Sequence, residues 1–345
     1  FQKPGTAFAL GRFMKTAFLV LGSVKTHGGE VRRLQVMAKQ EFKAAVVLAK
    51  PGAGEGDLGV ADCAVGCDLM PPQGTAMALL NKCHGAGFKI IGVLPLAQEA
   101  AGLGALIASA LGLPGAEVVA AGETGTGPIR HSWDHCPSHS WITAMESLAE
   151  SPSVATQWVV PAPVAGGSRR RIGCAGLAAA RSMGWQGGAT HSVLGGIVKL
   201  CPGDMRIWDL AMHAYPRLNP WVSWMRWATG LEVPFKLEAE NPAHCYAGLR
   251  LVRAPQSGVL MRLPRAVMGR DEVLSWGYTK AVGDMVTAEP RTREDFIGYV
   301  MMKSFDYEQL CLDLRRMAEH VSARIEVGVA PRLIQEAQTI RDHRH

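Results

Sequence analysis

The sequence is poor in charged side chains and has no long apolar run. Charged residues make up 19% of the 345 residues and hydrophobic residues 48%, a balance typical of a globular protein and not of a disordered one. No stretch reaches the roughly 18 apolar residues that a membrane-spanning helix needs. The formal charge of +6 is not arranged as the basic stripe with interleaved aromatics that nucleic-acid binders show. We therefore expect neither nucleic acid nor a membrane among the partners.

The cysteines also lack a pattern. There are eight of them, and the Cys63/Cys67 pair has no matching second pair with which to form a zinc ribbon. Cysteines at irregular spacings are typical of reduced thiols, which favours a cytoplasmic location. The apolar run near the N-terminus, "KTAFLVLGS", ends in a Gly-Ser turn and not in a small-x-small cleavage site. We interpret 16–22 as a first β-strand and not as part of a secretory signal.

One glycine-rich stretch, "KPGAGEGDLG" (50–59), follows a predicted strand but matches neither the dinucleotide-binding fingerprint nor the P-loop. Its acidic residues Glu55 and Asp57 would repel a phosphate, so we interpret it as a turn between two strands. The segment after "TAFLVLG" lacks the glycine spacing of the dinucleotide fingerprint as well. This disfavours a nicotinamide oxidoreductase, which stays the weakest of the functional alternatives.

A second glycine-rich stretch, "VAGGSRRRIG" (164–173), has the residue types that hold a phosphate. The backbone N–H groups of Gly166, Gly167 and Ser168 can turn toward one point, and the arginines that begin at Arg169 can donate to phosphate oxygens. On the pattern alone, a phosphate-binding loop and a plain basic turn are equally open.

The first third of the chain has a regular alternation of apolar patterns. Between Lys15 and Gly115, short apolar runs alternate with stretches of helical spacing, which predicts a parallel sheet covered by helices on both faces. Residues 116–157, rich in Gly, His, Trp and Pro, predict an irregular surface segment. Four of its side chains have metal-ligand chemistry, although a solvated histidine-rich loop is the plainer interpretation; they are His131, His135, Cys136 and His139.

The rest of the chain predicts a mixed fold. Residues 187–210 predict two strands joined by a "CPGD" hairpin turn, and "NPWVSWMRWATG" (219–230) predicts a helix. From residue 244 onward the pattern indicates antiparallel strands, and 306–327 predicts an amphipathic helix.

In this order, the segments resemble the ATP-grasp superfamily, in particular its branch of L-amino acid ligases and carboxylate–amine ligases. The resemblance rests on "IIGVLPLAQEAAGLGALIASALGLPG" (90–115), "GGATHSVLGGIVKLCPGDMRIWDL" (187–210), "PRLNPWVSWMRWATGLEVP" (216–234) and parts of 246–318, and it covers most of 15–327. The implied fold class is α/β and α+β, with an N-terminal parallel α/β domain, a shortened ATP-grasp-like α+β domain and a C-terminal antiparallel subdomain. The implied parts are 14–116 (N-terminal α/β domain), 117–157 (irregular linker), 158–234 (shortened ATP-grasp core), 235–330 (C-terminal α+β subdomain) and 331–345 (polar tail).

The resemblance also implies an activity and a set of site residues. Such ligases use ATP and Mg²⁺ to convert a carboxylic acid into an acyl-phosphate, which an amine then attacks. A small carboxylic acid and an amine would therefore be the substrates, and a homodimer is one assembly that the sequence leaves open. Carried over residue by residue, the expected ATP contacts are Gly166, Gly167, Ser168 and Arg169, the expected magnesium ligand is Asp209 and the expected catalytic cation is Arg217.

Four departures from the family pattern favour a second hypothesis, a degenerate relative that binds nucleotide weakly or not at all. Ala162 stands where the family has a lysine, Val193 where it has a metal-binding carboxylate, and Ala211 where it has an asparagine. The 17 residues of 174–190 are too few for the family's adenine-binding strand. The ligase hypothesis and the degenerate hypothesis both stay open.

Overall fold

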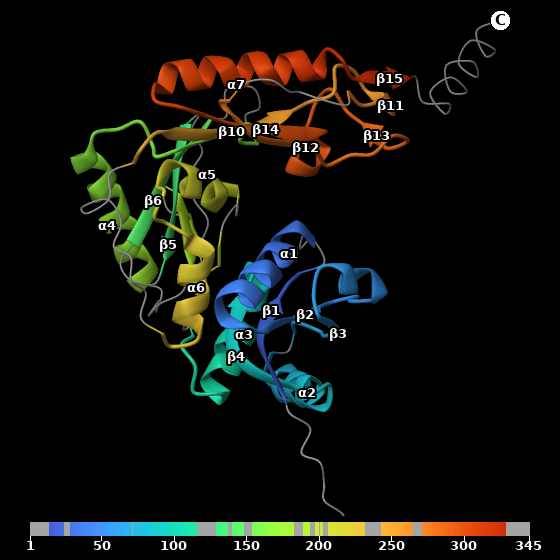
Figure 1. The fold of residues 1–345 in the computed structure, drawn as a ribbon, viewed down its shortest axis with the longest axis vertical. Coiled ribbons are helices and arrows are strands. Elements are labelled where there is room, and N and C mark those ends of the chain that lie inside the picture. The colour runs from blue at the N-terminus through green and yellow to red at the C-terminus, as the bar shows by residue number, and fades with distance from the viewer. Residues whose placement is uncertain are drawn as a thin grey trace, which may run out of the picture.

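The computed structural model describes residues 14–23, 28–70, 72–115, 129–136, 140–147, 154–182, 189–193, 197–199, 201–202, 206–231, 243–264 and 271–328. In these residues the chain forms three sheets with helices packed against them (Figure 1). The first sheet is parallel and alternates with helices, and the other two are antiparallel. The predicted fold class, α/β followed by α+β, is confirmed.

The N-terminal lobe is built on the parallel sheet, whose strand order is β3-β2-β1-β4. Its strands are β1 (Lys15–Leu21), β2 (Ala45–Lys50), β3 (Cys63–Gly66) and β4 (Phe88–Pro95), and its helices are α1 (Gly28–Met37), α2 (Pro72–Gly85) and α3 (Gln98–Ala110). The middles of β1 and β2 are buried because helices cover both faces of the sheet, whereas the edge strand β3 is only partly buried. The chain adds β2 and β3 on one side of β1 and then places β4 on the other side.

The connection between β2 and β3 contains a 3-10 helix, Glu55–Gly59. Asp57 closes this connection, because its carboxylate accepts a hydrogen bond from the backbone N–H of Gly54 over 3.0 Å and pairs with Lys50 at 2.8 Å. Residues 50–59 therefore join two strands, as predicted. A short π-helix, Ala38–Phe42, continues α1.

The second sheet has eight antiparallel strands in the order β12-β14-β10-β7-β6-β5-β8-β9. They are β5 (Ile129–Cys136), β6 (Ser140–Ser147), β7 (Gln157–Val160), β8 (Thr190–Val193), β9 (Ile197–Lys199), β10 (Tyr246–Val252), β12 (Val273–Tyr278) and β14 (Gly298–Ser304). The prediction of an irregular segment was wrong for β5 and β6. These strands are stabilised by backbone hydrogen bonds to neighbouring strands of a wide sheet. Such pairing depends on distant parts of the chain, so the sequences of β5 and β6 need not show the apolar alternation from which a strand is predicted. His139 and the side chains of His131, His135 and Cys136 lie outside the described residues.

Four helices accompany this sheet, namely α4 (Gly166–Ser182), α5 (Arg206–Ala214), α6 (Pro220–Ala228) and α7 (Tyr307–Ser322). Helix α5 corrects a prediction, since 206–210 was expected to be the second strand of a hairpin. The buried positions Ile207, Leu210, Ala211 and Ala214 recur every three or four residues, which is a helical spacing. The hairpin is formed by β8 and β9 instead.

The third sheet has the order β13-β11-β15, with β11 (Gly258–Arg262), β13 (Met285–Val286) and β15 (Glu326–Gly328). Its buried residues Leu260 and Val286 share a core with Leu310 and Leu314 of α7. Figure 1 shows α7 lying across this end of the molecule. Among the described helices, none combines the length and the apolar character that crossing a membrane requires.

A single apolar core joins the N-terminal lobe to the eight-stranded sheet. It contains Phe18 of β1 together with Trp158, Trp208 and Trp221, all at most 1% exposed. The ring of Trp208 meets that of Trp221 edge to face at 5.3 Å, an arrangement that aromatic pairs favour. Helix α6 packs against β4 at Gly92, where an added Cβ would meet the Phe18 ring at 2.8 Å. The domain limits predicted from the sequence stay predictions.

Candidate functional site at the junction of the two lobes

The predicted magnesium ligand, Asp209, lies where the N-terminal lobe meets the helices of the second half. It lies in the first turn of α5, and its side chain is 11% exposed. A guanidinium nitrogen of Arg33, on α1, forms an ion pair with Asp209 Oδ1. The indole N–H of Trp221, on α6, donates to the same oxygen over 3.3 Å. Asp209 therefore connects three helices, one of them from the other lobe.

Arg33 is held from two sides. Its guanidinium carbon lies 5.6 Å from the centre of the Trp221 ring, within the range of a cation–π contact. Burial lowers the pKa of Arg33, and the nearby Tyr299 and Glu30 raise it. Because an arginine remains charged in proteins, its contact with Asp209 is ionic. Tyr299, on β14, packs against the apolar core that contains Val31 and Leu34 of α1, so the eight-stranded sheet also takes part in the junction.

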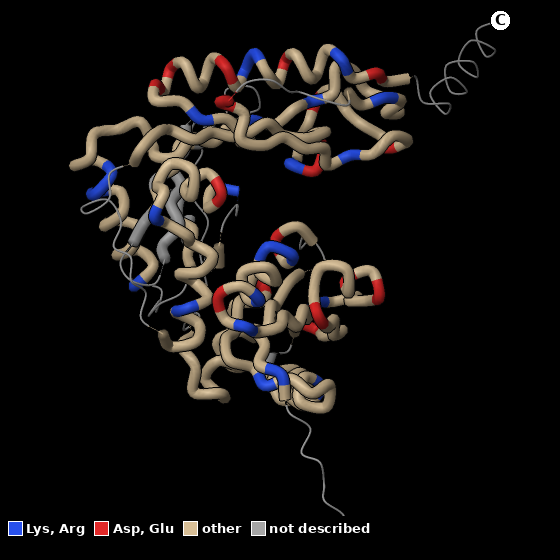
Figure 2. Tube along the Cα trace, viewed as in Figure 1, with Lys and Arg blue, Asp and Glu red and all other residues tan. Residues whose placement is uncertain are grey.

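Two more basic residues, His213 and Lys303, belong to the same electrostatic environment as Arg33. Burial lowers the pKa of His213, on α5, and the positive charges of Lys303, on β14, and Arg33 lower it further. The imidazole is therefore neutral at pH 7. Figure 2 shows basic residues on α1 and on the strands above it. With His213 neutral, this junction, which we call the lobe junction (Arg33, Asp209, His213, Lys303), has the two positive charges of Arg33 and Lys303 against the one carboxylate of Asp209, an excess that favours an anion.

The lobe junction, as it stands, does not offer the ligand set of a magnesium site. Mg²⁺ takes six oxygen ligands in proteins and is usually held by one or two carboxylates together with substrate phosphates. In the part of the chain that the structure describes, no three His, Cys, Asp or Glu side chains come together to hold a metal ion. Asp209 Oδ1 is engaged by Arg33 and Trp221. The assignment of Asp209 as a metal ligand stays a prediction, and it requires that Arg33 move away.

The expected phosphate-binding residues lie in the first turn of α4 and not in a loop. The backbone N–H groups of Ser168 and Arg169 in this turn already donate to the carbonyl oxygen of Ala165, over 2.8 and 3.0 Å. The side chains bind their own segment as well. Arg169 donates to the carbonyl oxygen of Val164 over 3.0 Å, and Arg171 donates to Ser168 Oγ over 3.1 Å.

The structure does not bring the predicted residues of α4 and α5 together. Helix α4 packs against β5, β6, β8 and β9, whereas α5 packs against β10 and β7 and lies beside α6. Figure 1 shows α4 on one side of β5 and β6, and α5 and α6 on the other side. Arg217 is exposed in the connection between α5 and α6. Arg217 thus follows Asp209 closely along the chain, whereas Gly166, Gly167, Ser168 and Arg169 lie on a helix that packs against other strands.

Two of the departures from the family pattern are buried. Ala162, which follows β7, and Ala211, on α5, are both 0% exposed. A lysine or an asparagine at these positions would have to place a polar group in this packed core, which is costly without a partner. The side chain of Val193 lies outside the described residues, and so do 183–188 of the shortened segment.

Comparisons with known proteins support the fold. No family model matches the sequence, and no curated protein matches it. Among solved structures, L-amino acid ligase from Bacillus licheniformis is similar with a TM-score of 0.72 and 12% identity, over 92% of this chain and 99% of that one. Phosphoribosylglycinamide synthetase from Anaerococcus prevotii is similar with a TM-score of 0.69 and 12% identity, over 91% and 99%.

The biotin carboxylase domain of the Hydrogenobacter thermophilus 2-oxoglutarate carboxylase, solved with MgADP, ADP and bicarbonate, is also similar. Its TM-score is 0.53 at 11% identity, over 91% of each chain. At such identities the likeness shows the fold and carries no residue assignment. All three enzymes have the ATP-grasp fold, and the similarity extends over nearly the whole of this chain. The fold of this protein is therefore the ATP-grasp fold.

Proposed function

We propose that the protein is an ATP-dependent ligase that joins a carboxylic acid to an amine through an acyl-phosphate. The observation that carries this proposal is the agreement in fold along almost the full length of both chains with an L-amino acid ligase. ATP and Mg²⁺ are the proposed cofactors, supported by the MgADP complex of the similar biotin carboxylase domain. A small carboxylic acid and an amine are the proposed substrates.

The lobe junction is the proposed place of reaction. Its basic groups Arg33 and Lys303 would attract the phosphates of a nucleotide or the carboxylate of a substrate. Arg217 lies on the next connection of the chain, within the same half of the molecule. Catalysis of phosphoryl transfer depends mainly on position and on neutralisation of charge, which is what a group of cations at a lobe boundary can provide.

A degenerate ATP-grasp protein, with weak or no nucleotide binding, is the second candidate function. The ion pair of Asp209 with Arg33 favours it, because this pair occupies the carboxylate that a metal ion would need. The buried alanines Ala162 and Ala211 favour it as well. In this case the former metal ligand has become a structural contact between the lobes.

Binding of Mg-ATP separates the two candidates. A ligand present at 100 times its dissociation constant stabilises the folded state by about 2.7 kcal/mol, so a thermal-shift series with Mg-ATP should raise the melting temperature of a ligase. Release of ADP that depends on both an added carboxylic acid and an added amine would then establish the reaction. The matched variants are Arg217→Met, which should lose the release of ADP, and Arg315→Met, an exposed arginine of α7 that should keep it. Absence of any shift at millimolar Mg-ATP would leave the degenerate candidate.

A further inference from the structure

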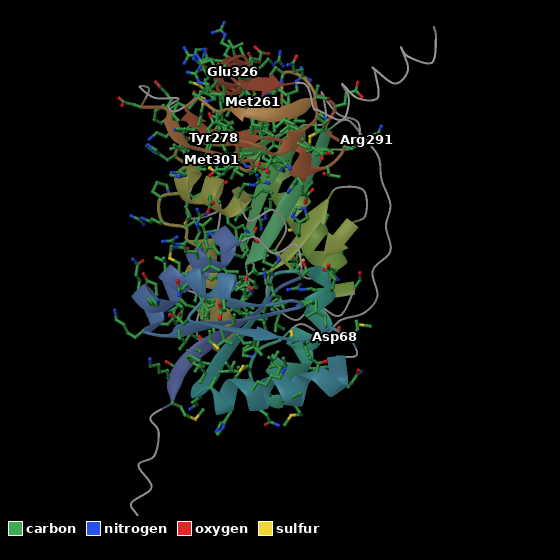
Figure 3. The ribbon with its side chains drawn as sticks, turned by 90° about the vertical axis from the view of Figure 1, so that its right-hand side faces the viewer. Asp68, Met261, Tyr278, Arg291, Met301 and Glu326 are labelled. Atoms are coloured by element: carbon green, nitrogen blue, oxygen red, sulfur yellow. The ribbon has the colours of Figure 1, made fainter. Side chains whose placement is uncertain are left out.

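A cavity of about 660 Å³ lies in the N-terminal lobe, at the carboxyl ends of β2 and β3 and along one side of α2. Its size is typical of small-molecule sites. Ligands of open parallel sheets bind outside the carboxyl ends of the strands. None of the residues that line it belongs to the lobe junction. Figure 3 labels Asp68, one of its lining residues, far from Tyr278 and Met301 of the eight-stranded sheet.

The cavity has one basic and one acidic side chain. The ammonium group of Lys82 donates to the carbonyl oxygen of Gly66 over 3.1 Å, which holds it at the end of β3 with two further N–H donors. The carboxylate of Asp68 accepts a hydrogen bond from the backbone N–H of Met70 over 3.1 Å through one oxygen. Among the ion pairs of the described residues, none joins Lys82 to Asp68. Both charges are thus available to a ligand.

The thiol of Cys67 also lines the cavity. Burial raises its pKa, while the charge of Lys82 lowers it and that of Asp68 raises it, and the net shift is upward. The thiol is therefore protonated at neutral pH and forms a neutral part of the wall. Lys82, Asp68 and Cys67 all line the one cavity, so the ammonium and the carboxylate border the same space.

Apart from Thr75, the remaining walls are apolar side chains and glycines. Leu79 is 1% exposed and belongs to the core beneath the cavity, and Pro51 and Ala78 add apolar surface. Two glycines, Gly66 and Gly74, line the cavity at ordinary backbone angles, and a Cβ built on either would have no atom within 4 Å. Side chains are thus absent where they would fill the space.

We propose that this cavity binds a free amino acid with an apolar side chain. The carboxylate of the ligand pairs with Lys82, its ammonium group pairs with Asp68, and its side chain lies against Leu79. A molecule with a single charge would leave one of the two protein charges without a partner. This second site is independent of the proposed reaction at the lobe junction.

Titration calorimetry with the full chain tests the chemistry. L-Leucine is the probe, and its matched analogues are 4-methylpentanoate, which lacks the amine, and 3-methylbutylamine, which lacks the carboxylate. Leucine should bind, and each analogue should bind at least about tenfold more weakly, because a lost charged hydrogen bond corresponds to about 1.5 kcal/mol or more. Absence of leucine binding, or equal binding of an analogue, would overturn the proposal.

Two variants test the location. Gly74→Leu should fill the cavity and abolish leucine binding, whereas Gly102→Leu, at a helical glycine of α3 that is equally open, should leave it unchanged. A further measurement needs no variant. Leucine should slow the alkylation of Cys67 and leave that of Cys174, exposed on α4, unaffected. Binding that survives in Gly74→Leu, or alkylation of Cys67 that leucine does not slow, would refute the assignment to this cavity.

Discussion

The ion pair between Arg33 and Asp209 should stabilise the attachment of the N-terminal lobe, and its two ends should not be equivalent. Arg33→Met keeps most of the apolar stem but leaves the carboxylate of Asp209, 11% exposed, without its cation. Asp209→Asn keeps an oxygen that can accept the hydrogen bond of Trp221. It also leaves Arg33, whose side chain is 41% exposed, so water can hydrate the guanidinium. We therefore expect Arg33→Met to be the more destabilising change.

The magnitude follows from the partial burial of the pair. Two unit charges about 4 Å apart attract each other by about 4 kcal/mol at an effective dielectric constant of about 20, and desolvation cancels part of this. Exposed pairs contribute up to about 1 kcal/mol, and loss of one partner of a buried pair costs about 3–5 kcal/mol. For this half-buried pair we expect about 2–3 kcal/mol for Arg33→Met and about 1 kcal/mol for Asp209→Asn.

Urea unfolding of both single variants and the double variant is the assay. The double variant should lose less than the sum of the single losses, with a coupling energy of about 1 kcal/mol. Lys39→Met on the neighbouring exposed pair with Asp62 is the control and should cost less than about 1 kcal/mol. If Asp209→Asn retained full stability and abolished stabilisation by Mg-ATP, the structural role would be refuted and the predicted metal role would replace it.

Three further predictions concern stability. Gly248→Ala should destabilise by about 1–3 kcal/mol in urea unfolding, because its Cβ would lie 2.6 Å from Leu314 Cδ1 in a packed core; a neutral result would contradict the packing of α7. Asp306→Ala should lower the free energy of unfolding by about 1 kcal/mol, because the side chain caps α7 through a hydrogen bond of 2.7 Å to the backbone N–H of Gln309. Unfolding followed by circular dichroism measures this loss, and an unchanged stability would contradict the cap. Backbone hydrogen bonds, that of Thr292 first, lower the pKa of Asp295. Its contribution is therefore complete above the ordinary pKa of about 4 and is lost as pH falls through the lowered value, so unfolding at pH 2–7 should show a weaker acid dependence in Asp295→Asn.

Local patterns were sufficient where each element carries its own period. The sequence of 15–115 alternates short apolar runs with stretches of helical spacing, and the structure has the predicted alternation, with β1 to β4 and α1 to α3. The helix α6 was predicted as well, with its N-cap Asn219 accepting a hydrogen bond from the backbone N–H of Val222. Helix capping and the spacing of apolar side chains involve residues that are close together in the chain, so they can be predicted from the sequence.

Elements that depend on distant partners were missed. β5 and β6 carry polar side chains and are stabilised by pairing within the eight-stranded sheet. Residues 206–210 match a strand in the family pattern, but the apolar positions of 206–214 have helical spacing, and this segment is a helix buried against β10 and β7. A short run of apolar residues is compatible with a helix and with a strand, and only packing against neighbouring elements decides between the two.

The sequence by itself determined the class of the fold, because hydrophobic period and turn residues act over short distances. Only the tertiary structure decided what the polar residues do. Asp209 forms an ion pair with Arg33, a residue of the other lobe that no local sequence pattern connects to it. The glycines and Ser168 of α4 lie on a helix that packs against other strands than α5 does. The tertiary structure also brought Lys82 and Asp68 to one cavity. Contacts of this kind depend on how whole elements pack, and packing is decided by the chain as a whole.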